Sequence, residues 1–244
     1  MRQGFDTIPG GGSRDADSGG RHMKMTQDVP TDGIAPKSID GRHARSQLTR
    51  ESIMLTAERL FAERGIGNVS LRDISLAAGQ KNNGAVQYHF RDRENLVVEV
   101  VRFRSEYIEK VRGERLEEIA SLKGEPTVRD YVAAFVDGLA SALDEDNYFL
   151  RFLSRFAIET GGTTGQVGSR EDRDFMRAKM LRLMPHLSVD MLNHRWQIMV
   201  LTTVHILAGY QASIKAGSLG KPLNWLLADL TNFLTAGLQA PAPE

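Results

Sequence analysis

Apolar residues recur at helical spacing almost throughout the chain from Ser46 onward. The first such run carries Ile53, Met54, Ala57, Leu60 and Phe61, which share one face of a helix. No stretch shows the sustained alternation of apolar and polar residues that a half-buried strand displays. The sequence therefore predicts an all-α fold, and 244 residues are enough to bury a sizeable core.

The chain divides into three segments by composition and pattern. Residues 1–45 are rich in glycine, poor in apolar side chains and without helical or strand period, so we expect a disordered extension. Residues 46–92 form the first folded unit, and residues 93–240 form the second. We expect the first helix to start at a cap provided by Ser46 or Thr49 and to end at Gly65.

Composition excludes several classes of protein. There is no cysteine, which excludes disulfide scaffolds, thiolate metal sites and cysteine nucleophiles. Lys plus Arg and Asp plus Glu both number 31, so binding to nucleic acid by bulk positive charge is excluded. The longest apolar stretch, residues 196–210, is too short and too polar to span a membrane, and no signal peptide is recognised. We expect a soluble, cytoplasmic protein.

Catalytic and metal-binding patterns are not recognised in the sequence. Asp190 and His194 are four residues apart, which makes half of a metal site, but no second half follows at a recognisable spacing. There is no phosphate-binding glycine loop and no nucleophile motif. We therefore expect no metal, no cofactor and no enzymatic activity.

Residues 70–90 show the pattern of a helix-turn-helix. Ser70 and Asp73 are placed as a capping box for a short helix that ends at Gly79. Turn-forming residues 81–84 follow, then a second short helix over 84–90, after which Asp92 caps a long helix. Two short helices joined by a tight turn are braced by the helix before them.

The second short helix divides its side chains between two environments. Ala85, Val86 and Phe90 are expected to face inward, which leaves hydrogen-bonding side chains to project outward. Such groups suit base edges and phosphates in a major groove. A helical corner with a polar turn and no DNA-binding role is an equal alternative on geometry alone. The outward group comprises Gln87, Tyr88 and His89, and Asn82 and Asn83 lie at the N-terminal edge of the helix.

Three stretches of this sequence, 55–65, 69–79 and 88–96, resemble the N-terminal DNA-binding domain of the tetracycline-repressor (TetR) family. They read LTAERLFAERG, VSLRDISLAAG and YHFRDRENL, in the order and at the spacing of that family. The segment between Gly79 and Tyr88 is one residue longer than the commonest family pattern. The resemblance favours DNA binding, followed by a helical ligand-binding and dimerisation domain.

The resemblance also assigns roles to individual residues. It implies that Ser70 caps a helix whose N-terminus meets a phosphate, and that Tyr88, His89 and Arg93 contact the phosphate backbone. It makes Asn82, Asn83, Ala85 and Gln87 the candidates for reading bases, with Lys81 in the same turn as a further DNA contact. Each has a structural alternative, such as a solvated ion pair for Arg93.

The last two predicted helices, about 189–216 and 223–238, are apolar on more than one face. Such helices must be buried, either in the core of the chain or against a second copy. Without the family the two alternatives are equal; the resemblance favours a four-helix dimer interface. The predicted interface comprises Trp196, Val200, Val204, Leu207, Leu226, Leu230 and Phe233.

Aromatic and methionine side chains in the second segment predict an apolar ligand pocket, because methionine adapts to irregular cavities. For any single residue, plain core is the stronger alternative. Arg151 and Arg155 lie beside this stripe and suit an acidic ligand, although a solvent-facing position is favoured. The predicted ligand-binding residues are Phe135, Phe149, Phe152, Phe156, Met180 and Met199.

Together these patterns predict a homodimeric transcriptional repressor that a small apolar or aromatic ligand releases from double-stranded operator DNA. Ligand binding would shift the long helix, residues 92–122, like a lever and change the separation of the two recognition helices. The alternative is an all-α small-molecule-binding or interaction protein without a role in DNA regulation.

Overall fold

The computed structural model describes residues 39–80, 84–121, 123–144, 146–160, 170–218 and 220–243. These residues form nine helices and no strand, which confirms the predicted all-α fold. The helices are α1 (Ile39–Arg64), α2 (Leu71–Ala77), α3 (Gly84–Phe90), α4 (Arg93–Ser121), α5 (Val128–Ala140), α6 (Phe149–Glu159), α7 (Arg170–Leu183), α8 (Val189–Lys215) and α9 (Leu223–Gln239).

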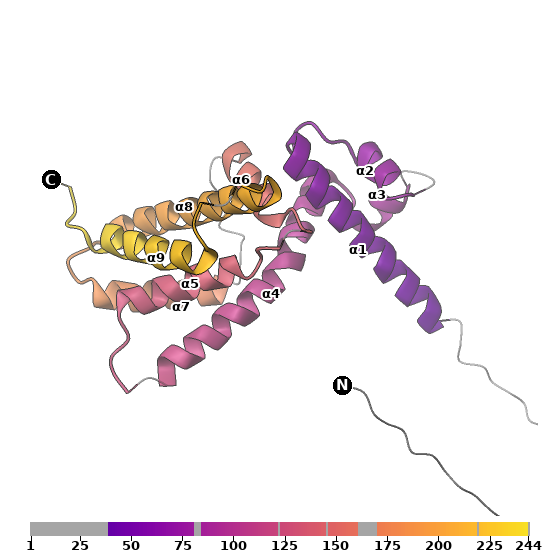
Figure 1. Ribbon diagram of the computed structural model, residues 1–244. Coiled ribbons are helices and arrows are strands. Elements are labelled where there is room, and N and C mark those ends of the chain that lie inside the picture. Colours follow the sequence, from indigo (N-terminus) through magenta and orange to yellow (C-terminus); the bar gives the residue numbers. More distant parts are fainter. Residues whose placement is uncertain are drawn as a thin grey trace, which may run out of the picture.

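The helices form two bodies joined by α4. Figure 1 shows α1, α2 and α3 together at one end of the molecule, and α5 to α9 bundled at the other. Helix α4 starts beside α3 and runs into the bundle, where it packs on α5. Helix α1 also packs on α6, so the small body contacts the bundle at a second place.

The start of α1 corrects the predicted boundary at residue 45, because the helix begins at Ile39. Thr49 is not a cap: its hydroxyl donates to the carbonyl of Arg45 at 2.9 Å, one turn earlier in the same helix. The segment before Ile53 is largely polar and shows no apolar stripe, so its sequence carries no periodic sign of this helical extension. Residues 1–38 of the predicted extension lie outside the described residues.

The other predicted helix ends are largely confirmed. Gly65 and Gly79 both have positive φ, +88° and +70°, which favours glycine where a helix terminates. Asp92 accepts a hydrogen bond from the backbone N–H of Asn95 at 2.8 Å, as an N-cap does. The predicted loop at 160–169 lies outside the described residues except for Thr160.

One hydrophobic cluster runs through both bodies. Phe61 of α1 stacks on Phe152 of α6 with ring centroids 6.0 Å apart, and both belong to this cluster. The contact joins the small body to the bundle through apolar surface. None of the helices in the described ranges is long and apolar enough to cross a membrane.

Candidate nucleic-acid interface

Helix α2 is fixed by the predicted capping box. The Ser70 hydroxyl accepts from the backbone N–H of Asp73 at 3.1 Å, and the Asp73 carboxylate accepts from the backbone N–H of Ser70 at 2.9 Å. The Ser70 hydroxyl also donates to this carboxylate at 2.6 Å. These hydrogen bonds hold the pKa of Asp73 below its ordinary value. The Ser70 side chain thus already has partners within the chain.

Helix α3 packs through Val86 and Phe90, which are both buried. Gln87 and Tyr88 lie on the opposite side and are exposed, Tyr88 to 82%. Ala85, which we expected to face inward, is half-buried. The helix therefore presents polar side chains to solvent while two apolar ones fix it to the domain.

His89 lies at the boundary between the exposed and packed sides of α3. Its ring is edge-on to Tyr88 at 5.2 Å between centroids, and 6.0 Å from Phe90. Burial, and then the nearby positive charge of Arg50, lower the pKa of His89. Three further predicted DNA contacts, Lys81, Asn82 and Asn83, lie outside the described residues.

Arg93 is half-buried and contacts the loop between α1 and α2. Its Nη1 donates to the carbonyls of Ile66 and Gly67 at 3.4 and 3.3 Å, and its Nη2 lies 3.7 Å from the Glu94 carboxylate. Arg93 therefore braces this loop, and its predicted phosphate contact stays a prediction.

Arg50 is a bracing residue that the sequence pattern did not single out. Its guanidinium lies over the Phe90 ring, 5.2 Å from the centroid, and pairs with Glu99 of α4. Glu99 also pairs with Arg102. The signal that points to Arg50 is weak, because its partners are 40 and 49 residues further along the chain.

The small body is attached to the bundle by polar contacts as well. Glu58 of α1 is only 2% exposed, and its carboxylate accepts from Arg104 Nε at 2.6 Å and Nη2 at 3.1 Å. The same carboxylate accepts from the backbone N–H of Tyr148, just before α6, at 2.9 Å. Glu58 thus joins α1, α4 and the start of α6.

The far end of α6 holds the α1–α2 loop. The Glu159 carboxylate accepts from the backbone N–H of Ile66 at 2.9 Å and of Gly67 at 3.1 Å. Arg155, one turn earlier, donates through Nε to the carbonyl of Ala62 at 2.8 Å. The expected solvent-facing position of Arg155 is therefore wrong, since this side chain is half-buried against α1.

The predicted ligand-binding side chains are packed into the core. All six are buried and belong to the hydrophobic cluster, and their predicted contact with a ligand stays a prediction. Met199 also lines a pocket between α8 and α9. Within α6, Phe152 stacks on Phe156 and is tilted against Phe149, with ring centroids 6.1 and 6.2 Å apart. The six are Phe135, Phe149, Phe152, Phe156, Met180 and Met199.

Most of the predicted interface side chains also point into the chain. Five of them are buried in the core of the chain, which corrects their assignment to a partner-facing surface: Trp196, Val200, Val204, Leu207 and Leu230. Leu226 is half-buried, and Phe233 is 69% exposed. Apolar residues of α8 and α9 therefore cover two sides of these helices. One side packs in the core, and the other forms a second, partly exposed surface.

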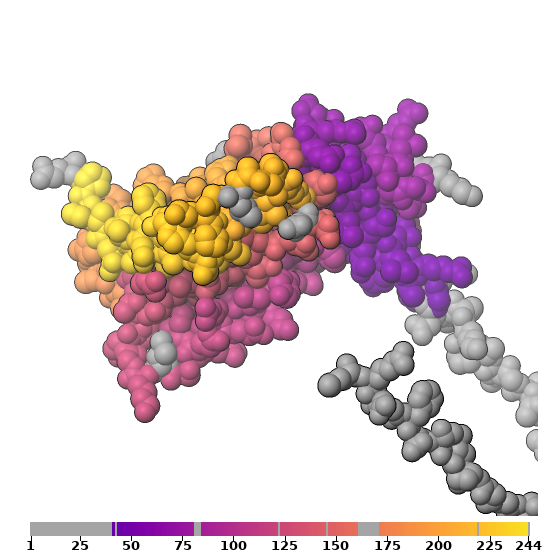
Figure 2. Space-filling view, viewed as in Figure 1, coloured from indigo at the N-terminus to yellow at the C-terminus, as the bar shows by residue number. Residues whose placement is uncertain are grey.

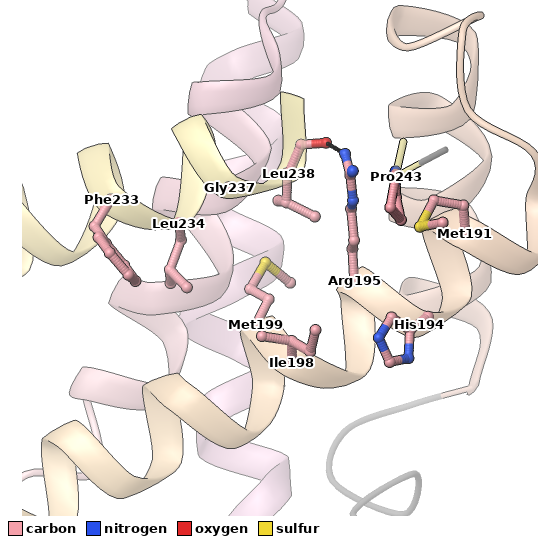
Figure 3. A pocket seen from close by; sticks show the side chains of 10 residues that line it. All are labelled: Met191, His194, Arg195, Ile198, Met199, Phe233, Leu234, Gly237, Leu238 and Pro243. Atoms are coloured by element: carbon pink, nitrogen blue, oxygen red, sulfur yellow. Dashed lines mark hydrogen bonds between the residues drawn. The ribbon is translucent and has the colours of Figure 1, made fainter. Parts of the chain in front are cut away.

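That second surface is an apolar groove of about 460 Å³ between α8 and α9. Figure 3 shows Met191, His194, Ile198 and Met199 of α8 on one wall, and Phe233, Leu234 and Leu238 of α9 on the other. Arg195 crosses it and donates to the carbonyl of Leu238 at 2.8 Å. In Figure 2 both helices lie open on the face toward the viewer.

Asp190 and His194, the predicted half of a metal site, gain no third ligand among the described residues. No group of three or more His, Asp and Glu side chains suited to a metal ion occurs there.

The geometry is that of two short helices, α2 and α3, on a helical bundle, and comparison with known proteins shows what the part around these two helices is similar to. Residues 53–100 match the model described as bacterial regulatory proteins, tetR family. These residues are a TetR-family domain, which confirms the resemblance noted in the sequence.

Two curated proteins are similar over the same part of the chain. The HTH-type transcriptional regulator AcrR of Shigella flexneri is 40% identical over 55 residues, 22% of this chain and 25% of that protein. The HTH-type transcriptional repressor BepR of Brucella suis biovar 1 is 37% identical over 58 residues, 24% of this chain and 27% of that protein. The match spans about a quarter of each relative.

Solved structures extend the similarity of fold to the bundle. BioQ of Mycobacterium smegmatis aligns with a TM-score of 0.53 at 12% identity, over 79% of this chain and 98% of that chain. The ketosteroid transcriptional regulator KstR2 of Mycobacterium tuberculosis aligns with a TM-score of 0.50 at 19% identity, over 80% and 95%. The fold is therefore shared well beyond residues 53–100.

Proposed function

We propose that this protein is a sequence-specific DNA-binding transcriptional regulator, a repressor that a small molecule releases from its operator. The observation that carries the proposal is the division of α3, where Val86 and Phe90 are buried while Gln87 and Tyr88 face solvent. A short helix fixed by two apolar residues and exposing hydrogen-bonding groups suits insertion into a major groove. We place its action in the cytoplasm and assign it no enzymatic activity.

Gln87 and Tyr88 take different roles in this proposal. A glutamine amide pairs with adenine through two hydrogen bonds, so Gln87 is assigned to reading a base, together with Ala85 and, from the sequence alone, Asn82 and Asn83. The Tyr88 hydroxyl is assigned to a phosphate, which carries no sequence information. Lys81, His89, Arg93 and the capped start of α2 at Ser70 are assigned to the DNA backbone.

The test measures binding to the DNA upstream of the protein's own gene by fluorescence anisotropy. Gln87→Ala should relax the preference at one base pair, a loss of about 1–3 kcal/mol of discrimination. Tyr88→Phe should weaken binding about equally for every sequence, and Tyr107→Phe, which removes the hydroxyl of an exposed tyrosine on α4, should change nothing. Equal behaviour of the Gln87 and Tyr88 variants would contradict the division of roles.

We assign the homodimer interface to the exposed face of α8 and α9. Ile198 and Ile206 of α8 and Phe233 of α9 are between 40% and 69% exposed, a concentration of apolar surface. A second copy related by a two-fold axis would cover this face and give a pair of readers for two half-sites about one helical turn apart.

Phe233→Glu should convert the dimer to a monomer, measured by light scattering after size exclusion, and should lower operator affinity at the same time. Phe175→Glu is the matched control, because Phe175 on α7 is also exposed, to 47%, but lies on another helix. A dimer that survives Phe233→Glu together with Ile198→Glu refutes this interface.

Ligand response requires that the bundle and the small body move together. The Glu58–Arg104 and Glu159–loop contacts join α1 and the α1–α2 loop to α4 and α6. We assign the change in half-site separation to a shift of α4 and α6 as the ligand selects one of two dimer geometries. Small-molecule binding without sequence-specific DNA binding would instead favour an all-α binding protein with no regulatory role.

A further inference from the structure

Arg112 of α4 is a buried cation without a hydrogen-bond partner. The residue is 1% exposed, and Nε, Nη1 and Nη2 all lack partners in the part of the chain that the structure describes. Buried guanidinium groups are normally paired, because an unsatisfied charged donor in the interior is costly. No other described side chain has buried nitrogen or oxygen atoms in this condition.

The wall of the site around Arg112 is aromatic. The guanidinium lies over the Phe135 ring of α5, 5.2 Å from its centroid, and Phe135 is edge-on to Trp196 of α8 at 5.5 Å. Gly138 makes the approach of α4 and α5 possible here. A Cβ at Gly138 would lie 3.2 Å from the Arg112 Cβ and 3.4 Å from its Nε.

Nearby charges compensate Arg112 only in part. The carboxylates of Asp172 on α7 and Glu109 on α4 favour its charged form and Arg173 disfavours it, but burial outweighs them and lowers the pKa of Arg112. Neither carboxylate is a hydrogen-bond partner of Arg112. The planar fork of N–H donors therefore stays unused by the described residues.

We propose that Arg112 binds the carboxylate of a small-molecule ligand whose apolar body lies against Phe135 and Trp196. A guanidinium fork matches a carboxylate through two parallel hydrogen bonds, and such a pair is strongest where water is excluded. The aromatic wall suits an alkyl or aryl body. The ligand is the effector only if the proposed function holds, and in that respect the inference rests on it. The sequence led us to expect an apolar or aromatic ligand, and the structure narrows this ligand to an organic acid.

The position on α4 connects this site with the small body. Arg104, just over two turns before Arg112, holds Glu58 of α1. Pairing of Arg112 with a ligand therefore acts on the same helix that carries the contact to the DNA-binding domain.

The test uses the full-length chain with Trp225→Phe, which leaves Trp196, in contact with Phe135, as the sole tryptophan reporter. Decanoate and 4-phenylbutyrate are titrated against their methyl esters, which keep the apolar body and lose the charge. We expect a saturable change in Trp196 fluorescence, with at least one of the two acids binding at least tenfold more tightly than its ester.

Arg112→Met should lower the affinity for that acid at least tenfold and leave its ester unchanged. Gly138→Ala, which crowds the guanidinium, should weaken the acid as well and supplies a second variant if Arg112→Met fails to fold. Arg102→Met is the matched control, because this arginine lies on the same helix but is exposed, and it should keep the preference for the acid.

The proposal is overturned if neither acid binds the parent chain, or if Arg112→Met or Gly138→Ala retains the full preference. None of these measurements contains DNA. Loss of operator recognition with intact acid binding would therefore refute the regulator and leave this site standing, whereas the reverse result would refute only this site.

Discussion

Two arginines on α4 differ in how their charge is compensated. Arg104 meets Glu58 through two nitrogens, and this carboxylate also accepts a backbone N–H, so both charges are satisfied. Arg112 is buried without a partner, over an aromatic ring. A paired buried charge fixes how two elements sit together, whereas an unpaired one costs stability and is kept where it serves another purpose.

The largest expected effect is at the paired site. Arg104→Met leaves the Glu58 carboxylate buried without its countercharge, and should lower the free energy of unfolding by about 3–5 kcal/mol. Urea denaturation followed by circular dichroism measures it. Arg102→Met, which removes an exposed arginine from the same helix, should change stability by less than about 1 kcal/mol. Similar losses in both variants would show that the Glu58 contact has no special weight.

The unpaired site should respond in the opposite direction. Arg112→Met replaces an unsatisfied cation by an apolar side chain of similar length, so the free energy of unfolding should rise by about 1 kcal/mol or more. The same urea experiment gives the sign. A loss of stability would mean that Arg112 is compensated by its neighbours, which would remove the contrast with Arg104.

A third variant tests an exposed contact between the two bodies, for comparison with the buried contact of Glu58. Glu159→Gln weakens the acceptor of the Ile66 and Gly67 amides, and should cost about 1 kcal/mol. Hydrogen exchange of these two amides should become faster. Glu117→Gln, on the exposed side of α4, serves as the control and should leave their exchange unchanged.

The smallest effect is expected at His89. Burial and Arg50 lower its pKa in the folded state, so the unfolded chain binds the proton more tightly. The stability that His89 contributes is complete above the unfolded value, about 6.5, and is lost as the pH falls through the lower folded-state pKa. Melting temperatures from pH 7.5 to 5 should fall less for His89→Asn. An unchanged profile would contradict this assignment.

Local features of this chain were predictable from the sequence because their partners are near in sequence. Residues no more than four apart form the Ser70–Asp73 capping box, the Asp92 cap and the glycine ends of α1 and α2. The inward Val86 and Phe90 and outward Gln87 followed from helical periodicity. Helix α1 began earlier than predicted because its first turns are polar and carry no periodic mark.

Contacts between distant residues were not predictable in this way. Arg104 lies 46 residues from Glu58, and Glu159 lies 93 from Ile66, so no spacing rule links either pair. The apolar stripes of α8 and α9 predicted the two helices correctly. They did not predict which side of each helix faces the core and which faces outward. Val204 and Leu207 fill the core while Ile206, between them, stays exposed.

The small number of buried residues in α3 has a consequence for how the DNA preference of such a protein can change. Only Val86 and Phe90 of its seven residues are fully buried, so the outer positions carry almost no packing duty. Under the proposed function, substitutions at the exposed Gln87 should therefore change which DNA site is preferred while the melting temperature stays nearly constant. DNA preference and folding stability then depend on different residues of α3. A few substitutions in a duplicated copy would be enough to direct it to other promoters.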